Sequence, residues 1–231
     1  MAVPPLLLST VANADQDAVI AWDPLAGNPI ASFSGDTPTR STLMVTKSLV
    51  LCAVAKKPVL QMWSFKSSVS HKRLTTKGVV NALAFTNDDS IIFLAIEKNI
   101  YAYQTCSGCM LSVMEASHLA PIGQLVVSTP SPTHPALLLS ADTAGTLACW
   151  VLDSLSDGFT DLGQAQPLAH WESNENSSRH RPLWFVVQAS RTLPNSAFFG
   201  DCLVVTASTD GLKVCCSSFS PRDFYYFLKK G

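Results

Sequence analysis

Residues 78–103 read GVVNALAFTNDDSIIFLAIEKNIYAY and decide the fold. The stretch holds three apolar segments, GVVNALAFT (78–86), IIFLAI (91–96) and NIYAY (99–103), separated by short polar turns. Short apolar runs bounded by turn-forming residues are typical of strands. A fourth apolar segment, MLSVME (110–115), follows a turn at Ser107 and Gly108. The pattern therefore predicts a unit of four antiparallel strands.

A large aromatic residue recurs at the end of the third strand of each such unit. Trp22, Trp63, Tyr103 and Trp150 follow one another at intervals of 41, 40 and 47 residues. A fifth unit ends in DGLKVCC (210–216), with Cys215 at the aromatic position. A period of this size indicates the blades of a β-propeller. We expect an all-β fold with about five blades, at 6–35, 40–76, 78–115, 118–171 and 182–228.

The predicted ring is incomplete. The first unit lacks an inner strand, because only about five residues precede LLLST (6–10). Five units are also fewer than the roughly seven that commonly close such a ring. We therefore expect a partial propeller, from a fragment or a shortened gene product. The aromatic tail at 224–228 is an alternative candidate for the outer strand of the fifth blade.

Composition excludes several classes of protein. The chain has 231 residues, of which 47% are hydrophobic and 14% charged, and its formal net charge is −1. No global field therefore draws it toward nucleic acid or membranes, and no apolar run reaches the ~20 residues of a transmembrane helix. Seven cysteines are an odd number, and five lie inside apolar strand patterns. Buried free thiols favour a reducing, intracellular compartment over secretion.

Three segments resemble the third strand of WD40 repeats: AVIAWD (18–23), VLQMWS (59–64) and TLACWVL (146–152). His118 precedes Trp150 by 32 residues, and His180 precedes Cys215 by 35, similar to the His-to-Trp spacing of that repeat. In WD40 repeats a His, an Asp, a Ser or Thr and the Trp form a buried hydrogen-bonded set. The resemblance implies structural roles for Trp22, Trp63, Tyr103, His118, Asp142, Trp150, His180 and Asp210.

The order of these features resembles the N-terminal half of the Ipi-type WD-repeat subunits of the Rix-type complex, which matures the large ribosomal subunit. The resemblance covers roughly residues 6–215. It implies a non-catalytic scaffold of the nucleolus and nucleoplasm that holds protein subunits and the pre-ribosomal particle during pre-rRNA processing. The alternative is a WD-repeat adaptor of another complex, such as a ubiquitin ligase or a signalling assembly, because a fold does not fix a function.

No motif predicts a catalytic residue, a cofactor or a metal. Cys106-Ser107-Gly108-Cys109 is a C-x-x-C pair without the further ligands that zinc needs, so a turn between strands is the favoured interpretation. The histidines show no metalloprotease or nucleophile-elbow context, and phosphate-binding glycine loops are absent. An enzyme would need a site built from loops at a central channel, and nothing in the sequence indicates one.

Charge is distributed unevenly along the chain. Residues 37–87 hold eight basic residues and no acidic one, whereas residues 99–178 hold seven acidic residues and no basic one. Ordinary solvated surfaces would explain both sectors. The sharper hypothesis gives each sector its own partner, the basic one contacting RNA phosphate or an acidic protein through Lys56, Lys57, Lys72 and Arg73.

The polar stretch 153–181, which carries Phe159 and Trp171, is a second candidate contact. A disordered insertion is its alternative interpretation, and Trp171 fits equally an outer strand PLAHW (167–171).

Overall fold

The computed structural model describes twelve segments of the chain. They are residues 7–11, 18–34, 42–46, 50–54, 57–64, 72–115, 118–128, 136–152, 169–172, 184–189, 199–208 and 211–219. All regular elements of these segments are strands. Within the same segments no helix is long and apolar enough to cross a membrane.

The strands form five antiparallel sheets, which we number in chain order. Sheet 1 contains β1 (Leu7–Val11), β2 (Ala18–Trp22) and β3 (Pro29–Ser34). Sheet 2 contains β4 (Leu43–Val45), β5 (Val50–Val54), β6 (Val59–Ser64) and β7 (Lys72–Thr75). In each sheet every strand pairs with the next strand along the chain, so each sheet is a meander.

The remaining sheets repeat this order. Sheet 3 contains β8 (Val80–Phe85), β9 (Ile91–Ile96), β10 (Asn99–Gln104) and β11 (Met110–Met114). Sheet 4 contains β12 (Ile122–Ser128), β13 (Leu137–Asp142), β14 (Thr146–Val151) and β15 (Ala169–Glu172). Sheet 5 contains β16 (Trp184–Ala189), β17 (Phe199–Ser208) and β18 (Gly211–Phe219). The prediction of an all-β chain built from small antiparallel sheets is confirmed.

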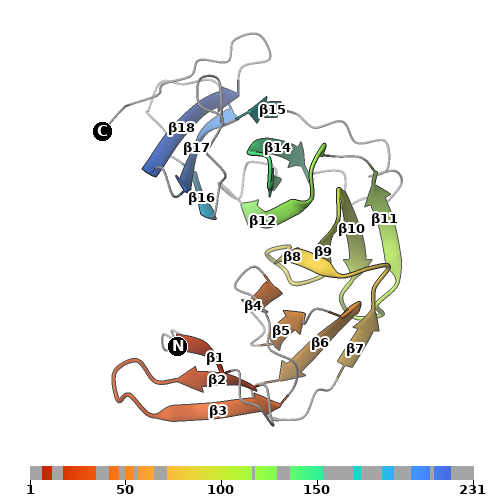
Figure 1. Ribbon diagram of the computed structural model, residues 1–231, viewed down its shortest axis with the longest axis vertical. Helices are drawn as coiled ribbons and strands as arrows, with labels where there is room; N and C mark the ends of the chain where they lie inside the picture. The colour runs from red at the N-terminus through yellow and green to blue at the C-terminus, as the bar shows by residue number, and fades with distance from the viewer. Residues whose placement is uncertain are drawn as a thin grey trace.

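The five sheets follow one another around an open arc (Figure 1). The first strands of sheets 2 to 5 are in contact one after another, β4 with β8, β8 with β12 and β12 with β16. These strands lie on the inner side of the arc, whereas β7 and β11 lie on its outer side (Figure 1). Sheets 1 and 5 stand at its two ends, and the arc is not closed into a ring.

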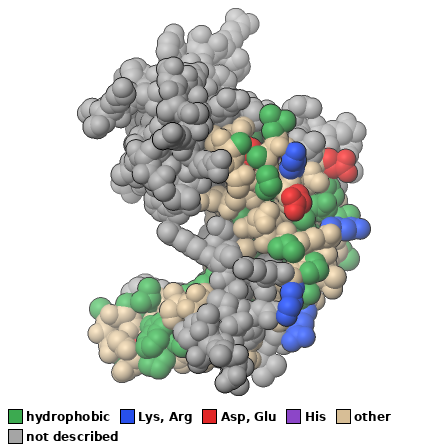
Figure 2. All heavy atoms as spheres, viewed as in Figure 1, with side chains coloured by type: hydrophobic (Ala, Val, Ile, Leu, Met, Phe, Trp, Pro, Cys, Tyr) green, Lys and Arg blue, Asp and Glu red, His purple; other side chains and the backbone are tan. Residues whose placement is uncertain are grey.

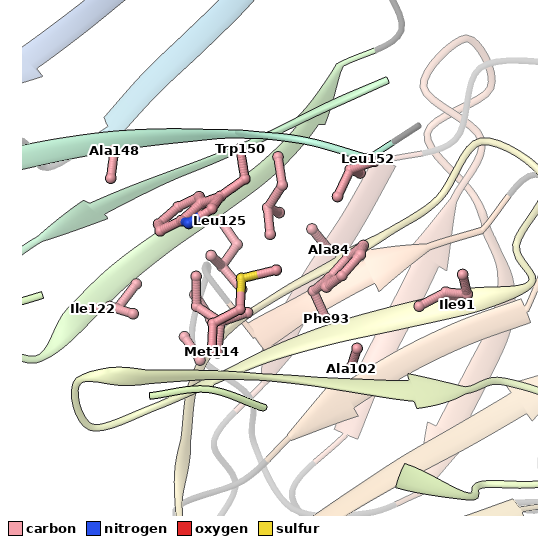
Figure 3. Close-up of a cluster of buried hydrophobic side chains, with 14 residues drawn as sticks. Ala84, Ile91, Phe93, Ala102, Met114, Ile122, Leu125, Ala148, Trp150 and Leu152 are labelled. Carbon is pink, nitrogen blue, oxygen red and sulfur yellow. The ribbon is translucent and has the colours of Figure 1, made fainter. Parts of the chain in front are cut away.

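A buried core fills the space between each pair of neighbouring sheets from 1 to 4. One cluster joins Val19 and Phe33 of sheet 1 to Trp63 of sheet 2, and a second joins sheet 2 to sheet 3. The third, between sheets 3 and 4, is drawn in Figure 3. Each inner sheet is therefore covered on both faces, which explains why all six residues of β9 are buried and apolar instead of alternating.

Sheet 1 has one strand fewer than sheets 2 to 4. Its aromatic residue, Trp22, is the last residue of the second strand, whereas the corresponding residues stand last but one in β6, β10 and β14, the third strands of their sheets. In the described part of the chain sheet 1 therefore begins at the level of the second strand. Residues 1–6, which precede β1, lie outside the described residues. The possible outer strand at 224–228 lies outside the described residues.

The polar stretch 153–181 contains β15. The backbone of β15 pairs with β14, and Leu147 stands opposite Trp171 in the register. The sequence left two interpretations open for Trp171, a disordered insertion and an outer strand. The pairing of β15 with β14 shows that Trp171 belongs to an outer strand. Phe159 lies outside the described residues.

Candidate functional site

The aromatic residues that end β6, β10 and β14 all lie at the junction with the preceding sheet. Trp63 is packed against sheet 1, Tyr103 against sheet 2 and Trp150 against sheet 3. Each is at most 4% exposed. Trp63 meets the ring of Phe33 at a centroid distance of 6.2 Å. We call Trp63, Tyr103 and Trp150 the junction aromatics.

Trp22 occupies the same position in sheet 1, and in the described part of the chain no sheet packs against it from the preceding side. Its side chain is therefore only half-buried, and its indole Nε1 donates to Ser9 Oγ over 2.7 Å. Ser9 was not anticipated from the sequence. Its signal was weak, because a serine in an apolar strand is usually just a solvent-facing residue.

His118 is the centre of a buried polar network beside Trp150. Its Nδ1 lies 3.2 Å from Asp142 Oδ2, and its Nε2 lies 2.5 Å from Ser140 Oγ. The imidazole ring also contacts Trp150, with ring centroids 6.0 Å apart. Because a carboxylate only accepts hydrogen bonds, Nδ1 carries the proton in the neutral imidazole and Nε2 accepts from the Ser140 hydroxyl.

Asp142 is held in its ionised form by the donors around it. Its Oδ1 accepts from the backbone N–H groups of Ala144 at 2.9 Å and Thr146 at 2.8 Å, which closes the turn between β13 and β14. Burial alone would raise the pKa of Asp142. The hydrogen bond from His118 and those from Thr146 and Ala144 outweigh burial and lower the pKa below its ordinary value.

The Ser140–His118–Asp142 chain has the connectivity of a nucleophilic triad, but its burial argues against catalysis. Ser140 is 0% exposed, His118 3% and Asp142 1%. A nucleophilic hydroxyl must reach the carbonyl or phosphoryl atom it attacks, and Ser140 presents no surface to a substrate. What the network can do is fix the chain before β12 to the β13–β14 turn, because every member satisfies another.

Two residues of the same expected role, His180 and Asp210, lie outside the described residues. Ser140 is the member that sequence reasoning did not assign. The only sequence signal for it was one hydroxyl residue inside the otherwise apolar segment ALLLSA (136–141).

Three of the four candidate basic contact residues are described, and they lie toward the two ends of one hairpin. Lys57 and Arg73 are exposed, and Lys56 lies outside the described residues. In the register of β6 and β7, Val59 pairs with Thr75 and Met62 with Lys72. Lys57 therefore lies near one end of this hairpin and Lys72 and Arg73 near the other, about 10 Å or more apart at the rise of a strand.

Lys72 is engaged inside the molecule. Its Nζ donates to the backbone carbonyls of Thr105 at 2.5 Å and Cys106 at 2.6 Å, in the turn between β10 and β11. The ammonium thus links the outer strand of sheet 2 to sheet 3. Its role as a contact for RNA is not supported by this geometry, because binding phosphate would compete with two existing hydrogen bonds.

One of the seven acidic residues of the acidic sector, residues 99–178, is not at the surface. Asp142 was counted there, yet its carboxylate is buried in the His118 network. Glu115 is exposed at the end of β11, and Asp153, Asp157, Asp161 and Glu175 lie outside the described residues.

The C-x-x-C pair is part of the turn that joins β10 to β11. Cys106 and Cys109 are exposed free thiols. Gln104 N donates to Cys109 O and Gly108 N donates to Gln104 O, both over 2.8 Å. No group of three or more potential metal-ligating residues occurs in the described segments. The turn that the sequence favoured is therefore the observed structure of this motif.

No protein-family model matches the chain, and no curated protein matches it.

Proposed function

We propose that the chain is a WD40-type β-propeller scaffold, with no catalytic activity, that acts in large ribosomal subunit assembly and pre-rRNA processing. The observation that carries the propeller part is the contact of His118 with Asp142 and Ser140, beside Trp150. The junction aromatics support it, because one large side chain per sheet, always on the same face, is what a ring of repeated blades requires.

A scaffold fits the described surface better than an enzyme does. The three side chains with the connectivity of a nucleophilic triad, Ser140, His118 and Asp142, are buried and satisfy one another, so they stabilise sheet 4 and present no reactive group to a substrate. Function then belongs to exposed strands and turns along the arc, which can contact protein partners over a broad surface.

The ribosomal part of the proposal is supported by the order of the sequence features. Under this proposal the protein acts in the nucleus, at the nucleolus and nucleoplasm, and its partners are assembly-complex subunits and the pre-ribosomal particle. It involves no membrane and no cofactor.

The test is affinity purification of the tagged full chain from nuclear extract. Co-purification of large-subunit pre-rRNA with assembly factors supports the proposal. Recovery of a ubiquitin-ligase core or a signalling complex without pre-rRNA would replace it with the adaptor function. A Lys98→Glu variant, whose side chain is exposed in the turn between β9 and β10, serves as a surface control.

A direct contact with RNA is tested separately. Lys57→Glu and Arg73→Glu reverse charge at the two ends of the β6–β7 hairpin, and Lys98→Glu, in the exposed β9–β10 turn, is the matched control. At low salt a phosphate contact should be weakened by Lys57→Glu or Arg73→Glu and not by Lys98→Glu. Unchanged binding of pre-rRNA by both hairpin variants removes the basic sector from the proposal. Lys72 is left intact because its loss would disturb the link between sheets 2 and 3.

A further inference from the structure

Two exposed thiols stand three residues apart in the turn between β10 and β11. Cys106 and Cys109 are both exposed, whereas Cys149, the other cysteine whose side chain is described, is completely buried. Cysteine is among the most frequently buried residue types, and its reactivity rather than its packing usually decides why it stands at a position. A packing role therefore does not account for this pair.

The turn itself does not require cysteine at either position. The turn between β2 and β3 is closed in the same way. In each turn a glycine at positive φ donates its N–H to the carbonyl four residues earlier, and that earlier residue donates its own N–H to the carbonyl of the residue after the glycine. In the turn of sheet 1, Leu25 and Asn28 stand where the turn of sheet 3 has Cys106 and Cys109. The two thiols are thus added to a turn that folds without them.

The backbone that carries the two thiols is held on both sides. Lys72 Nζ donates to Cys106 O over 2.6 Å and also to the carbonyl of the preceding residue. Cys109 O accepts from Gln104 N over 2.8 Å, and Cys109 N donates to Ser107 Oγ over 3.1 Å. Because these bonds fix the chain on either side of the pair, bringing the two sulfur atoms together costs less conformational entropy than in a free chain.

The chemistry of such a pair is that of a reversible disulfide. A bridge across two intervening residues is the one that the C-x-x-C motifs of thiol–disulfide enzymes form. In a reducing compartment a bridge of this kind is usually transient and responds to oxidants. The turn lies beside β7, on the outer side of the arc (Figure 1), and side chains of both charge signs face solvent along that side (Figure 2). A small, water-borne disulfide can therefore approach the pair.

We propose that Cys106 and Cys109 are a redox modification site that closes to a disulfide across the turn, with a low-molecular-weight disulfide such as glutathione disulfide as the oxidant. One cysteine thiolate attacks a sulfur of the oxidant, forms a mixed disulfide and releases one thiol. The second cysteine thiolate then attacks the cysteine sulfur of the mixed disulfide and releases the second thiol. The pair loses two electrons and two protons in all, and one oxidant molecule becomes two thiols. The site does not depend on the ribosomal role.

The experiment incubates the full chain in buffers of reduced and oxidised glutathione, quenches exchange with acid, alkylates the remaining thiols and maps the products by mass spectrometry. A glutamate-specific protease releases residues 98–115 as one peptide, because Glu97 and Glu115 flank it and no acidic residue lies inside it. The peptide contains Cys106 and Cys109 and no other cysteine. The wild-type peptide should lose two hydrogens and carry neither glutathione nor an alkyl group.

Two kinds of control separate closure from simple thiol reactivity. Cys106→Ser and Cys109→Ser each leave one thiol, so their peptides should carry one glutathione instead of the bridge. The control for the fold is the wild-type chain in guanidinium chloride, where the same sequence lacks the turn. In the same glutathione buffer, the ratio of bridged to open peptide should be roughly tenfold higher or more for the folded chain.

Several results would overturn the proposal. They are a wild-type peptide that stays fully alkylated, one that carries two glutathione groups, and one that is bridged to a second chain. Equal ratios of bridged to open peptide for the folded and the unfolded chain also overturn it, because the turn would then contribute nothing to closure.

Discussion

His118 Nδ1 and Asp142 Oδ2 lie 3.2 Å apart with both side chains shielded from solvent, and 24 residues separate them in sequence. The contact joins the segment that enters β12 to the turn between β13 and β14. One pair of side chains thereby ties the entry of sheet 4 to its central turn, and His118 packs against Trp150 at the junction with sheet 3.

Removing either partner should destabilise the protein strongly. Asp142→Ala leaves the His118 N–H buried without its acceptor, and His118→Ala leaves a buried carboxylate with one donor fewer. Each should lower the free energy of unfolding by about 3 kcal/mol. Urea unfolding followed by far-ultraviolet circular dichroism measures both, together with the double variant.

The double-mutant cycle supplies the control. If the two side chains act through their mutual contact, the double variant loses less stability than the sum of the single losses, by on the order of 1 kcal/mol or more. Strict additivity of the two losses would contradict the assigned contact.

The free energy of unfolding should decrease in acid as Asp142 becomes protonated. The folded pKa of Asp142 lies below its ordinary value of 3.8, so this group contributes stability above the unfolded pKa. That contribution is lost as the pH falls below about 4 and through the folded pKa. The free energy of unfolding should therefore decline across this range. Asp142→Asn should start less stable and show a shallower decline, measured by urea unfolding at a series of acidic pH values.

Asp88 is the comparison for that titration. The hydroxyl of Thr86, which donates to its carboxylate, lowers the pKa of Asp88, so the sign of its effect is the same. Its side chain is exposed, however, and solvent screens the interaction. Asp88→Asn should leave the decline close to that of the wild type, and a change as large as that of Asp142→Asn would refute the role given to the buried pair.

Replacing a junction aromatic by alanine should lower the free energy of unfolding more than replacing Trp22 does. Trp150 is 1% exposed between two sheets, so Trp150→Ala should cost about 3–5 kcal/mol through lost burial and a residual cavity. Trp22 lies on the side of β2 that faces away from sheet 2 and is half-buried, so Trp22→Ala should cost clearly less, about 1–2 kcal/mol. Circular dichroism during urea unfolding gives both values, and equal losses would contradict the different environments.

Much of the strand pattern was predictable from the sequence because its turns are well marked. IIFLAI (91–96) matches the bounds of β9. It is an apolar run with polar turns beside it, and a sheet covered on two faces requires such a run. The spacing of the aromatics also located the residues that the structure places at the sheet junctions.

The fate of individual polar residues was not predictable. Lys72 was grouped with Lys57 and Arg73 by charge alone, but its ammonium is held by carbonyls 33 and 34 residues further along the chain. Asp142 was counted as surface charge for the same reason. The sequence shows which side chains can ionise and how they are spaced along the chain. Whether such a side chain is buried, and what it contacts, depends on which segments the fold brings together. The turn between β2 and β3 in sheet 1 has the same backbone conformation as the turn between β10 and β11 in sheet 3. Sequence reasoning did not detect this shared turn, because it depends on backbone dihedral angles.

That shared turn allows one matched comparison. Gly27 and Gly108 each stand five residues after the aromatic, at φ values of 70° and 76°, and each donates its N–H to the carbonyl four residues earlier over 2.8 Å. A Cβ at position 27 would meet nothing within 4 Å, whereas one at 108 would lie 3.2 Å from Leu74 Cδ1 of sheet 2.

Replacement by alanine should therefore have unequal effects at the two turns. Both Gly27→Ala and Gly108→Ala should lose about 1 kcal/mol to the left-handed backbone conformation. Gly108→Ala should lose up to about 1 kcal/mol more, because Leu74 must shift in the contact with sheet 2. Urea unfolding of the two variants measures the difference. Asparagine tolerates this backbone conformation better than alanine does, so Gly27→Asn should recover part of the stability lost by Gly27→Ala. If both alanine variants lose the same amount, the β10–β11 turn does not pack against sheet 2 as described.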